Sequence, residues 1–231
     1  MSVKLSERLS AAYDMVTEGS VVADVGCDHA FLSIALVSSG KSPEVFACDV
    51  NEGPLEKARE NITASGLGAQ IHTVLSDGLV GLKEPVDSVV ICGMGGSLVI
   101  SIIEKSIEKA RQAKELILSP QSDVFKVRCF LRDSGFSLVE EKAVTDAGKY
   151  YVLMKVRPGG SLTLWDKYGD FGLKYGPYLI EKKDAAFMEH LKKRQSIIKG
   201  IITGIPGESE RKEDLKKEAD LIAGILYHTG G

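Results

Sequence analysis

Short apolar runs alternate with helical patterns along the first 157 residues of the chain. Runs typical of buried strands occur at 20–25, 44–50, 70–75, 86–92 and 115–119. Helical patterns occupy the stretches between and after them, near 29–39, 54–65, 95–110 and 122–134. Because strands that alternate with helices form parallel sheets covered on both faces, this pattern predicts an α/β fold with a doubly wound sheet.

Two further apolar runs, 136–144 and 149–156, differ from the first five. Only the short link TDAGK joins them, and Gly148 within it favours a turn. They are predicted to form an antiparallel hairpin that closes the sheet. Five parallel strands with such a terminal hairpin are typical of the Rossmann-like class I methyltransferases, whereas an NAD-type Rossmann sheet continues with a sixth parallel strand.

The pattern changes after residue 157. Residues 158–175 are rich in glycine and are predicted to be a linker. Apolar residues at helical spacing then occupy 177–203 and 208–228, separated by Gly204, Pro206 and Gly207, which predicts an α-helical hairpin resembling a coiled coil. We therefore expect a catalytic domain over 1–157 and a second unit, linker plus hairpin, over 158–231.

Composition narrows the class of protein. Apolar residues make up 44% of the 231 residues and charged residues 26%, as in ordinary globular proteins. The four cysteines lie far apart without a C-x-x-C pair, so neither a disulfide framework nor a metal site is expected. The N-terminus lacks an apolar signal stretch and no run is long enough to span a bilayer. A cytoplasmic protein without membrane contact is expected, and the oligomeric state stays open.

The first strand ends in a motif that suits a nucleoside cofactor. Asp24 and Gly26 are followed by Asp28 and His29 at a turn into a helix, where Gly26 lets the backbone approach a ligand and the next amides can bind its carboxylate. A plain strand-to-helix turn has the same pattern. We assign Asp24 and Gly26 to cofactor binding and Asp28 with His29 to catalysis, although a helix-start hydrogen bond explains His29 equally well.

The ends of the second and third strands offer further candidates for the same ligand. Asp49, followed by Val50, stands about 20 residues after Gly26, where a carboxylate can accept both ribose hydroxyls. Capping of the next helix is the alternative role for Asp49. Asp77 and Gly78 follow the third strand, where the Asp side chain or the next amide can read an adenine amino group. We assign all four residues to cofactor binding.

The loop Gly93-Met94-Gly95-Gly96 follows the fourth strand, beside the position of a transferable methyl group in this fold. It is not a dinucleotide fingerprint, because Leu98 stands where a third glycine is needed, so a nicotinamide enzyme is disfavoured. The loop also lacks the polar groups that hold an exocyclic amine. A ring nitrogen needs only alignment with the methyl group, so methylation of adenine N1 is favoured. We assign Gly93, Met94 and Gly95 to cofactor binding.

These motifs together resemble those of the bacterial tRNA (adenine-22-N1)-methyltransferases. The resemblance runs along nearly the whole chain and rests on Asp24–Ala30, Gly93–Gly96, Leu116–Gln121, Phe171-Gly172 and Gly176–Leu179. It implies S-adenosylmethionine as methyl donor, tRNA as substrate, and Pro120 and Gln121 near the target base. The chain departs from the family pattern at Asp49, usually glutamate, at Asp77, often asparagine, and at Ser122 and Asp123.

Basic residues in the predicted helical hairpin are candidates for RNA contact. Residues 158–231 hold 12 Lys and Arg against 11 Asp and Glu, while residues 1–157 hold 17 against 21. The cluster Lys192, Lys193 and Arg194 is assigned to tRNA binding on the strength of the resemblance. Charged residues of this kind ordinarily form the solvent-exposed face of a helix. The alternative function is a non-catalytic cofactor-sensing module whose hairpin binds a partner or a second copy.

Overall fold

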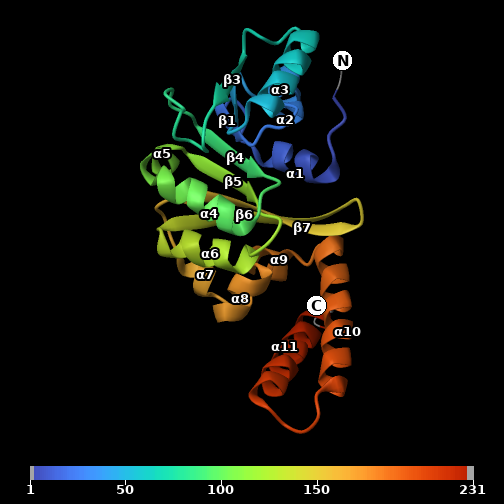
Figure 1. Ribbon diagram of the computed structural model, residues 1–231. Helices are drawn as coiled ribbons and strands as arrows, with labels where there is room; N and C mark the ends of the chain where they lie inside the picture. The colour runs from blue at the N-terminus through green and yellow to red at the C-terminus, as the bar shows by residue number, and fades with distance from the viewer. Residues whose placement is uncertain (1–2, 228–231) are drawn as a thin grey trace.

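The computed structural model describes residues 3–227, which form a seven-stranded sheet with helices on both faces (Figure 1). The strands are β1 (Val22–Val25), β2 (Val45–Asp49), β3 (Ile71–Leu75), β4 (Ser88–Cys92), β5 (Glu115–Ser119), β6 (Phe136–Asp146) and β7 (Lys149–Pro158). Their order across the sheet is β3-β2-β1-β4-β5-β7-β6.

The sheet combines a parallel part with an antiparallel hairpin. β1 to β5 pair in parallel, and β7 pairs antiparallel with both β5 and β6. The chain returns from β3 at the sheet edge to β4 beside β1, so the carboxyl ends of β1 and β4 flank a topological switch point, where such sheets bind ligands. The predicted five parallel strands and closing hairpin are confirmed.

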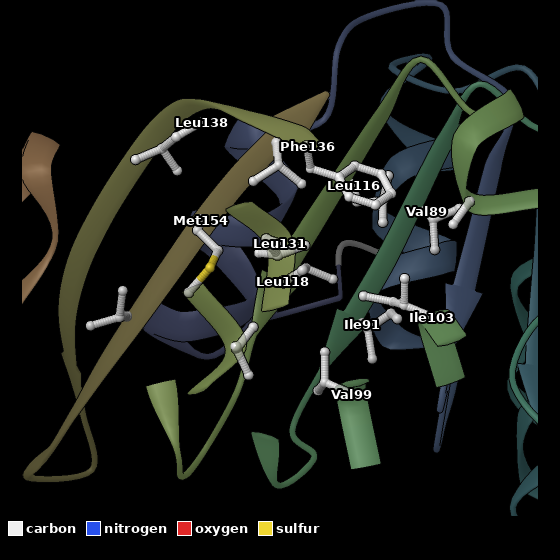
Figure 2. Close-up of a cluster of buried hydrophobic side chains, with 14 of the residues drawn as sticks. Val89, Ile91, Val99, Ile103, Leu116, Leu118, Leu131, Phe136, Leu138 and Met154 are labelled. Carbon is white, nitrogen blue, oxygen red and sulfur yellow. The ribbon is translucent and has the colours of Figure 1, made fainter. Parts of the chain in front are cut away.

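Each face of the sheet has its own apolar cluster. One face packs against α1 (Glu7–Met15), α2 (Phe31–Ser38) and α3 (Glu52–Ser65). The other packs against α4 (Gly96–Lys105), α5 (Ile107–Gln112) and α6 (Val124–Asp133), and Figure 2 shows the centre of this second cluster. Because side chains alternate along a strand, Val90 packs on the first face, and Val89 and Ile91 on the second.

Residues 158–175, expected to be a linker, instead contain short helices packed on the sheet. These are α7 (Thr163–Asp166) and α8 (Gly169–Tyr175), followed by α9 (Pro177–Lys182). Trp165 of α7 is fully buried, and its indole N–H donates to the Phe136 carbonyl at 2.8 Å. The glycines of this stretch therefore lie between or within short helices and do not form a linker. The boundary at 157 stays a prediction, although the apolar cluster continues beyond it.

A buried ion pair joins these short helices to the sheet. Arg128 of α6 and Glu141 of β6 lie 2.8 Å apart and are almost fully buried. Arg128 also donates to the Leu173 carbonyl at 3.0 Å, and Glu141 accepts from the Tyr178 amide at 3.1 Å. A Cβ at Gly176 would lie 2.7 Å from both charged groups, so this close packing requires glycine. The pair therefore holds α8 and α9 against β6.

The last two described elements, α10 (Ala185–Gly204) and α11 (Glu210–Tyr227), form the predicted helical hairpin. The hairpin extends away from the sheet (Figure 1). Phe187 at its base is fully buried, and the His190 ring stacks on Tyr150 of β7 at a centroid distance of 3.9 Å. No described helix is long and apolar enough to cross a membrane.

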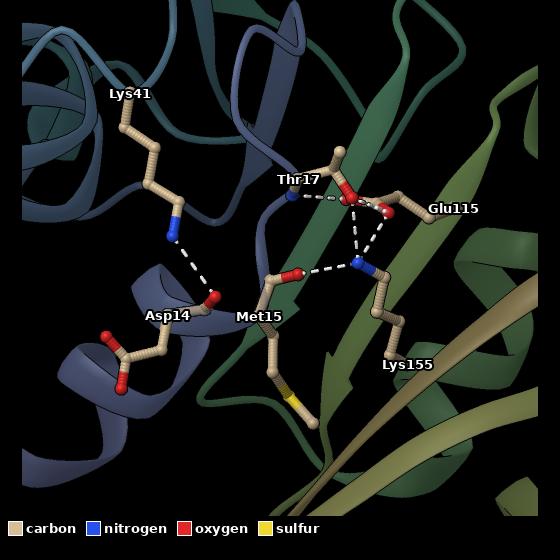
Figure 3. Close-up of polar contacts among 6 residues, drawn as sticks. All are labelled: Asp14, Met15, Thr17, Lys41, Glu115 and Lys155. Atoms are coloured by element: carbon tan, nitrogen blue, oxygen red, sulfur yellow. Dashed lines mark hydrogen bonds and ion pairs between the residues drawn. The ribbon is translucent and has the colours of Figure 1, made fainter.

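The N-terminal helix α1 was not predicted. Ser6 caps it by accepting a hydrogen bond from the Leu9 amide at 3.4 Å. At its other end, Lys155 of β7 donates to the Met15 carbonyl at 2.8 Å and pairs with Glu115 of β5 at 2.7 Å, and Glu115 accepts from the Thr17 amide at 2.8 Å (Figure 3). This mostly buried network fixes α1 against two strands.

Candidate cofactor and active site

A cavity of about 420 Å³ lies at the carboxyl ends of β1, β2 and β4, at the switch point of the sheet. Residues from α1, the loop after β1, α2, β2 and the loops after β4 and β5 surround it. Its lining is Arg8, Leu9, Asp24, Gly26, Cys27, Asp28, His29, Phe31, Leu32, Asp49, Cys92, Gly93, Met94 and Gln121. The cavity thus gathers most of the motifs that the sequence singled out.

The loop after β1 is held in a tight, strained turn. Gly26 has a φ of 76°, a backbone conformation that favours glycine, and a Cβ there would lie 2.2 Å from the terminal methyl group of Met94, which would have to shift. The amides of Gly26 and Cys27 donate to the Cys48 carbonyl at 2.8 and 3.0 Å, which ties the loop to β2. Asp28 and Ala30 also have positive φ, at 49° and 57°, a strain that recurs at functional sites.

Asp24 is the buried acid of the cavity. Its side chain accepts a hydrogen bond from the Ser33 hydroxyl at 2.7 Å, and only 5% of the residue is exposed. Burial raises the pKa of Asp24 to about 6, while the Ser33 hydrogen bonds lower it in part. A positively charged ligand group nearby would favour the ionised carboxylate.

Asp28 and His29 lie side by side at the mouth of the cavity. The Asp28 side chain is 76% exposed and its Oδ1 lies 3.6 Å from Nε2 of His29. The His29 ring stacks on Phe31 at 5.3 Å, and Asn61 donates to the His29 carbonyl at 3.0 Å. The structure therefore presents an accessible carboxylate beside an oriented imidazole.

Asp49 lines the cavity from the end of β2. Its Oδ1 accepts a hydrogen bond from the Asn51 amide at 2.9 Å, just before α3 begins. The carboxylate thus supports the turn into the helix with one oxygen and retains acceptor capacity for a ligand hydroxyl. Both roles considered for Asp49 fit this geometry.

Four residues assigned to the cofactor do not line the cavity. Val50 is an exposed side chain, and Asp77 pairs with Lys105 of α4 at 2.7 Å. Gly78 packs against Ile102, and Gly95 stands at the N-cap of α4 near Ser122. Their assignment to cofactor binding stays a prediction with less geometric support than that of Gly26, Asp49, Gly93 and Met94.

Comparisons with known proteins identify the family of this chain. The methyltransferase domain family matches residues 5–154. The tRNA (adenine(22)-N(1))-methyltransferase of Bacillus subtilis is 31% identical over 98% of both chains. The chain belongs to this family. The resemblance inferred from the sequence motifs is confirmed.

Solved structures of other members share the whole fold of this methyltransferase. The crystal structure of the B. subtilis m1A22 tRNA methyltransferase superposes with a TM-score of 0.85 at 27% identity, covering 97% of this chain and 99% of that one. An M. capricolum relative, solved with the cofactor product S-adenosylhomocysteine, has a TM-score of 0.81 at 25% identity, covering 96% and 97%. The likeness therefore includes the C-terminal helices.

A second cavity of about 310 Å³ shares Gln121 with the first. Pro120 and Gln121 after β5 line it, together with Tyr151 and Arg194. The Gln121 amide donates to the Met94 carbonyl at 2.8 Å, which connects the loops after β4 and β5. In this methyltransferase Gln121 thus lines both cavities, whereas Pro120 lines the second cavity alone.

The three basic residues predicted for RNA contact lie on α10 in different environments. Arg194 pairs with Glu218 of α11 at 2.9 Å, and Lys193 pairs with Glu189 at 2.6 Å. Lys192 is exposed and forms no ion pair within residues 3–227. None of these three side chains lines the cofactor cavity, and Arg194 lines the second cavity.

Arg8 of α1 is a cavity residue that the sequence did not reveal. Its guanidinium lies 4.9 Å from the centre of the Tyr151 ring, while its Nε and Nη1 are buried without a hydrogen-bond partner. The serine cap at Ser6 and the apolar spacing after it indicate a helix, but placement beside the cavity depends on tertiary packing. No described cluster of His, Cys, Asp or Glu forms a metal site.

Proposed function

We propose that this protein is a cytoplasmic enzyme that transfers a methyl group from S-adenosylmethionine to N1 of adenine 22 in tRNA. The observation that carries the proposal is the cavity at the switch point, lined by Gly26, Asp49, Gly93 and Met94 in a member of this family. The B. subtilis relative, whose name states this reaction, matches along 98% of the chain.

The cavity fits an adenosyl cofactor by the chemistry of its lining. Gly26 leaves room for a ligand beside the backbone, Asp49 offers a carboxylate to ribose hydroxyls, and Asp24 offers one to an ammonium group. Bound S-adenosylmethionine would supply an electrophilic methyl group on a sulfonium. Gly93 and Met94 would border that methyl group, and Met94, in contact with the Gly26 turn, would shift to admit the ligand.

The catalytic task left to the protein is modest. Adenine N1 has an in-plane lone pair, so the enzyme needs to align it and to stabilise the positive charge that methylation places on the base. Asp28 is the accessible carboxylate at the cavity mouth, with His29 at 3.6 Å to orient it. We assign Asp28 to stabilising the cationic base or to accepting its proton.

The substrate side is assigned to two regions. Pro120 and Gln121 would face the target base, because they line the second cavity where it meets the first. Lys192, with Lys193 and Arg194, would contact phosphates along the hairpin. The separate domains proposed for cofactor and RNA, 1–157 and 158–231, would divide these tasks.

The deciding experiment is methylation of unmodified tRNA with S-adenosylmethionine, followed by mass analysis of the nucleosides. We expect 1-methyladenosine, and none when position 22 of the transcript is guanine. Asp28→Asn should lower turnover more than cofactor affinity. A wild type that binds S-adenosylmethionine but methylates no tRNA would instead be a cofactor-sensing module.

A further inference from the structure

We propose that Arg8 is the oxyanion-binding residue of the cofactor cavity, taking either the carboxylate of S-adenosylmethionine or a phosphate of the bound RNA. The inference rests on the proposed function. Arg8 lines the cavity, and its Nε and Nη1 are buried without any hydrogen-bond partner. A buried donor left unsatisfied destabilises the protein, and a charged one does so more strongly, so such donors in a cavity point to a ligand.

The guanidinium also lacks a counter-charge. No carboxylate of residues 3–227 lies within 4 Å of it, although Asp24, Asp28 and Asp49 line the same cavity. The groups beside Arg8 are the Tyr151 ring, the Gly93 backbone and the side-chain amide of Gln121. A Cβ placed on Gly93 would lie 3.5 Å from Nη2 of Arg8 and 3.7 Å from Nε2 of Gln121. This corner of the cavity is therefore rich in donors.

The cavity thus contains both acidic side chains and a basic one, which suits a zwitterionic ligand. The acidic residues suit ribose hydroxyls and an ammonium group, whereas Arg8 suits a carboxylate. Arginine binds carboxylates and phosphates through paired N–H donors, so the same residue could instead hold a phosphate of the nucleotide entering from the second cavity. In both cases the ligand group is an oxyanion.

Arg8 is held in place before any ligand arrives. The Lys155–Glu115 network fixes the carboxyl end of α1, and the Arg8 amide donates to Asp146 of β6 at 3.5 Å. The stack on Tyr151 further restricts the guanidinium. Binding would therefore require little reorganisation of the side chain.

The test compares wild type with Arg8→Met, using calorimetry with S-adenosylmethionine and with its decarboxylated analogue, and steady-state kinetics with tRNA. If the oxyanion is the cofactor carboxylate, Arg8→Met loses about tenfold or more in affinity for S-adenosylmethionine and little for the analogue. If it is a phosphate, both cofactor affinities persist, the KM for tRNA rises about tenfold, and the log–log salt slope of tRNA binding falls by about 0.7–0.9.

Matched variants keep the test decisive. Arg59→Met removes an exposed arginine that pairs with Glu52 outside the cavity, and should leave all three measurements unchanged. If Arg8→Met does not fold, Arg8→Lys, which keeps the charge but loses the paired donors, should show the same selective loss in smaller measure. A folded variant with all three measurements within twofold of wild type overturns the inference. A wild type that neither binds S-adenosylmethionine nor methylates tRNA overturns the proposed function as well.

Discussion

Charged side chains are arranged differently in the cofactor cavity and in the C-terminal hairpin. In the cavity, Arg8 has no ion-pair partner among the described residues, and Asp49 accepts a hydrogen bond from the Asn51 amide in the turn before α3. On the hairpin most cations are paired, as in Lys193 with Glu189, Arg194 with Glu218, and Lys216 with Glu208. A charged side chain without a partner indicates a ligand site, whereas charged side chains paired with one another indicate a structural role. The number of charges in a region is therefore a poor guide to its function.

The largest expected effect comes from breaking the most deeply buried ion pair. Arg128→Met should lower the free energy of unfolding by about 3–5 kcal/mol, because it leaves Glu141 buried without its counter-charge. Arg132→Met on the same helix removes a more exposed arginine paired with Asp133, and should cost less than about 1 kcal/mol. Chemical denaturation measures both. Equal losses would show that the buried pair contributes no more than a surface pair.

The next effect concerns a cavity carboxylate with spare acceptor capacity. Asp49→Ala should weaken S-adenosylmethionine binding by removing charge-assisted hydrogen bonds to the ribose, each worth about 1.5–3 kcal/mol. Asp14→Ala is the matched control, since Asp14 is an exposed carboxylate that pairs with Lys142 and does not line the cavity. Calorimetry showing equal affinity for wild type and Asp49→Ala would limit Asp49 to the turn before α3.

The parallel sheet and the loops at its carboxyl edge follow from local sequence, and the parts that depend on distant contacts do not. The alternation of apolar runs predicted the strands. The glycine-containing motifs predicted the loops of Gly26 and Gly93, and both loops line the cofactor cavity. The helices α7 and α8 were missed because glycines suggested a linker, whereas buried Trp165 and Leu173 hold them on the sheet. Arg8 was missed because nothing near it in sequence indicates the cavity.

The third prediction concerns Asp24, the buried acid of the cavity, and its effect on the stability of the fold. The pKa of Asp24 is raised by burial to about 6, above its ordinary 3.8, so its neutral form favours the fold. The stability it contributes is fully present below pH 3.8 and is lost as pH rises through 6. Asp24→Asn should therefore gain about 1–3 kcal/mol over ligand-free wild type between pH 4 and 8.

Thermal melts of both proteins at each pH measure this gain, because titration of the other groups cancels in the difference. Asp24→Asn should also bind S-adenosylmethionine more weakly at pH 8, since it lacks a carboxylate for the ammonium group. A difference in stability that stays constant with pH would contradict the raised pKa. Unchanged cofactor affinity would remove Asp24 from the ligand contacts.

The smallest expected effect tests whether open charges on the hairpin, like those of the cavity, mark binding. Lys192 and Lys193 are adjacent on α10 and both exposed, but within residues 3–227 only Lys193 has an ion-pair partner, Glu189 at 2.6 Å. If Lys192 neutralises one tRNA phosphate, Lys192→Ala should lower the log–log salt slope of tRNA binding by about 0.7–0.9. Lys193→Ala should change it less, because its charge is already balanced in the free protein. Filter binding across a salt series measures both slopes.

Equal reductions in the two slopes would mean that RNA displaces the ion pair between Lys193 and Glu189. An ion pair in the free protein would then not indicate whether a lysine contacts RNA. Unchanged slopes in both variants would remove this face of the hairpin from the RNA interface and favour a role in binding a protein partner or a second copy of the chain.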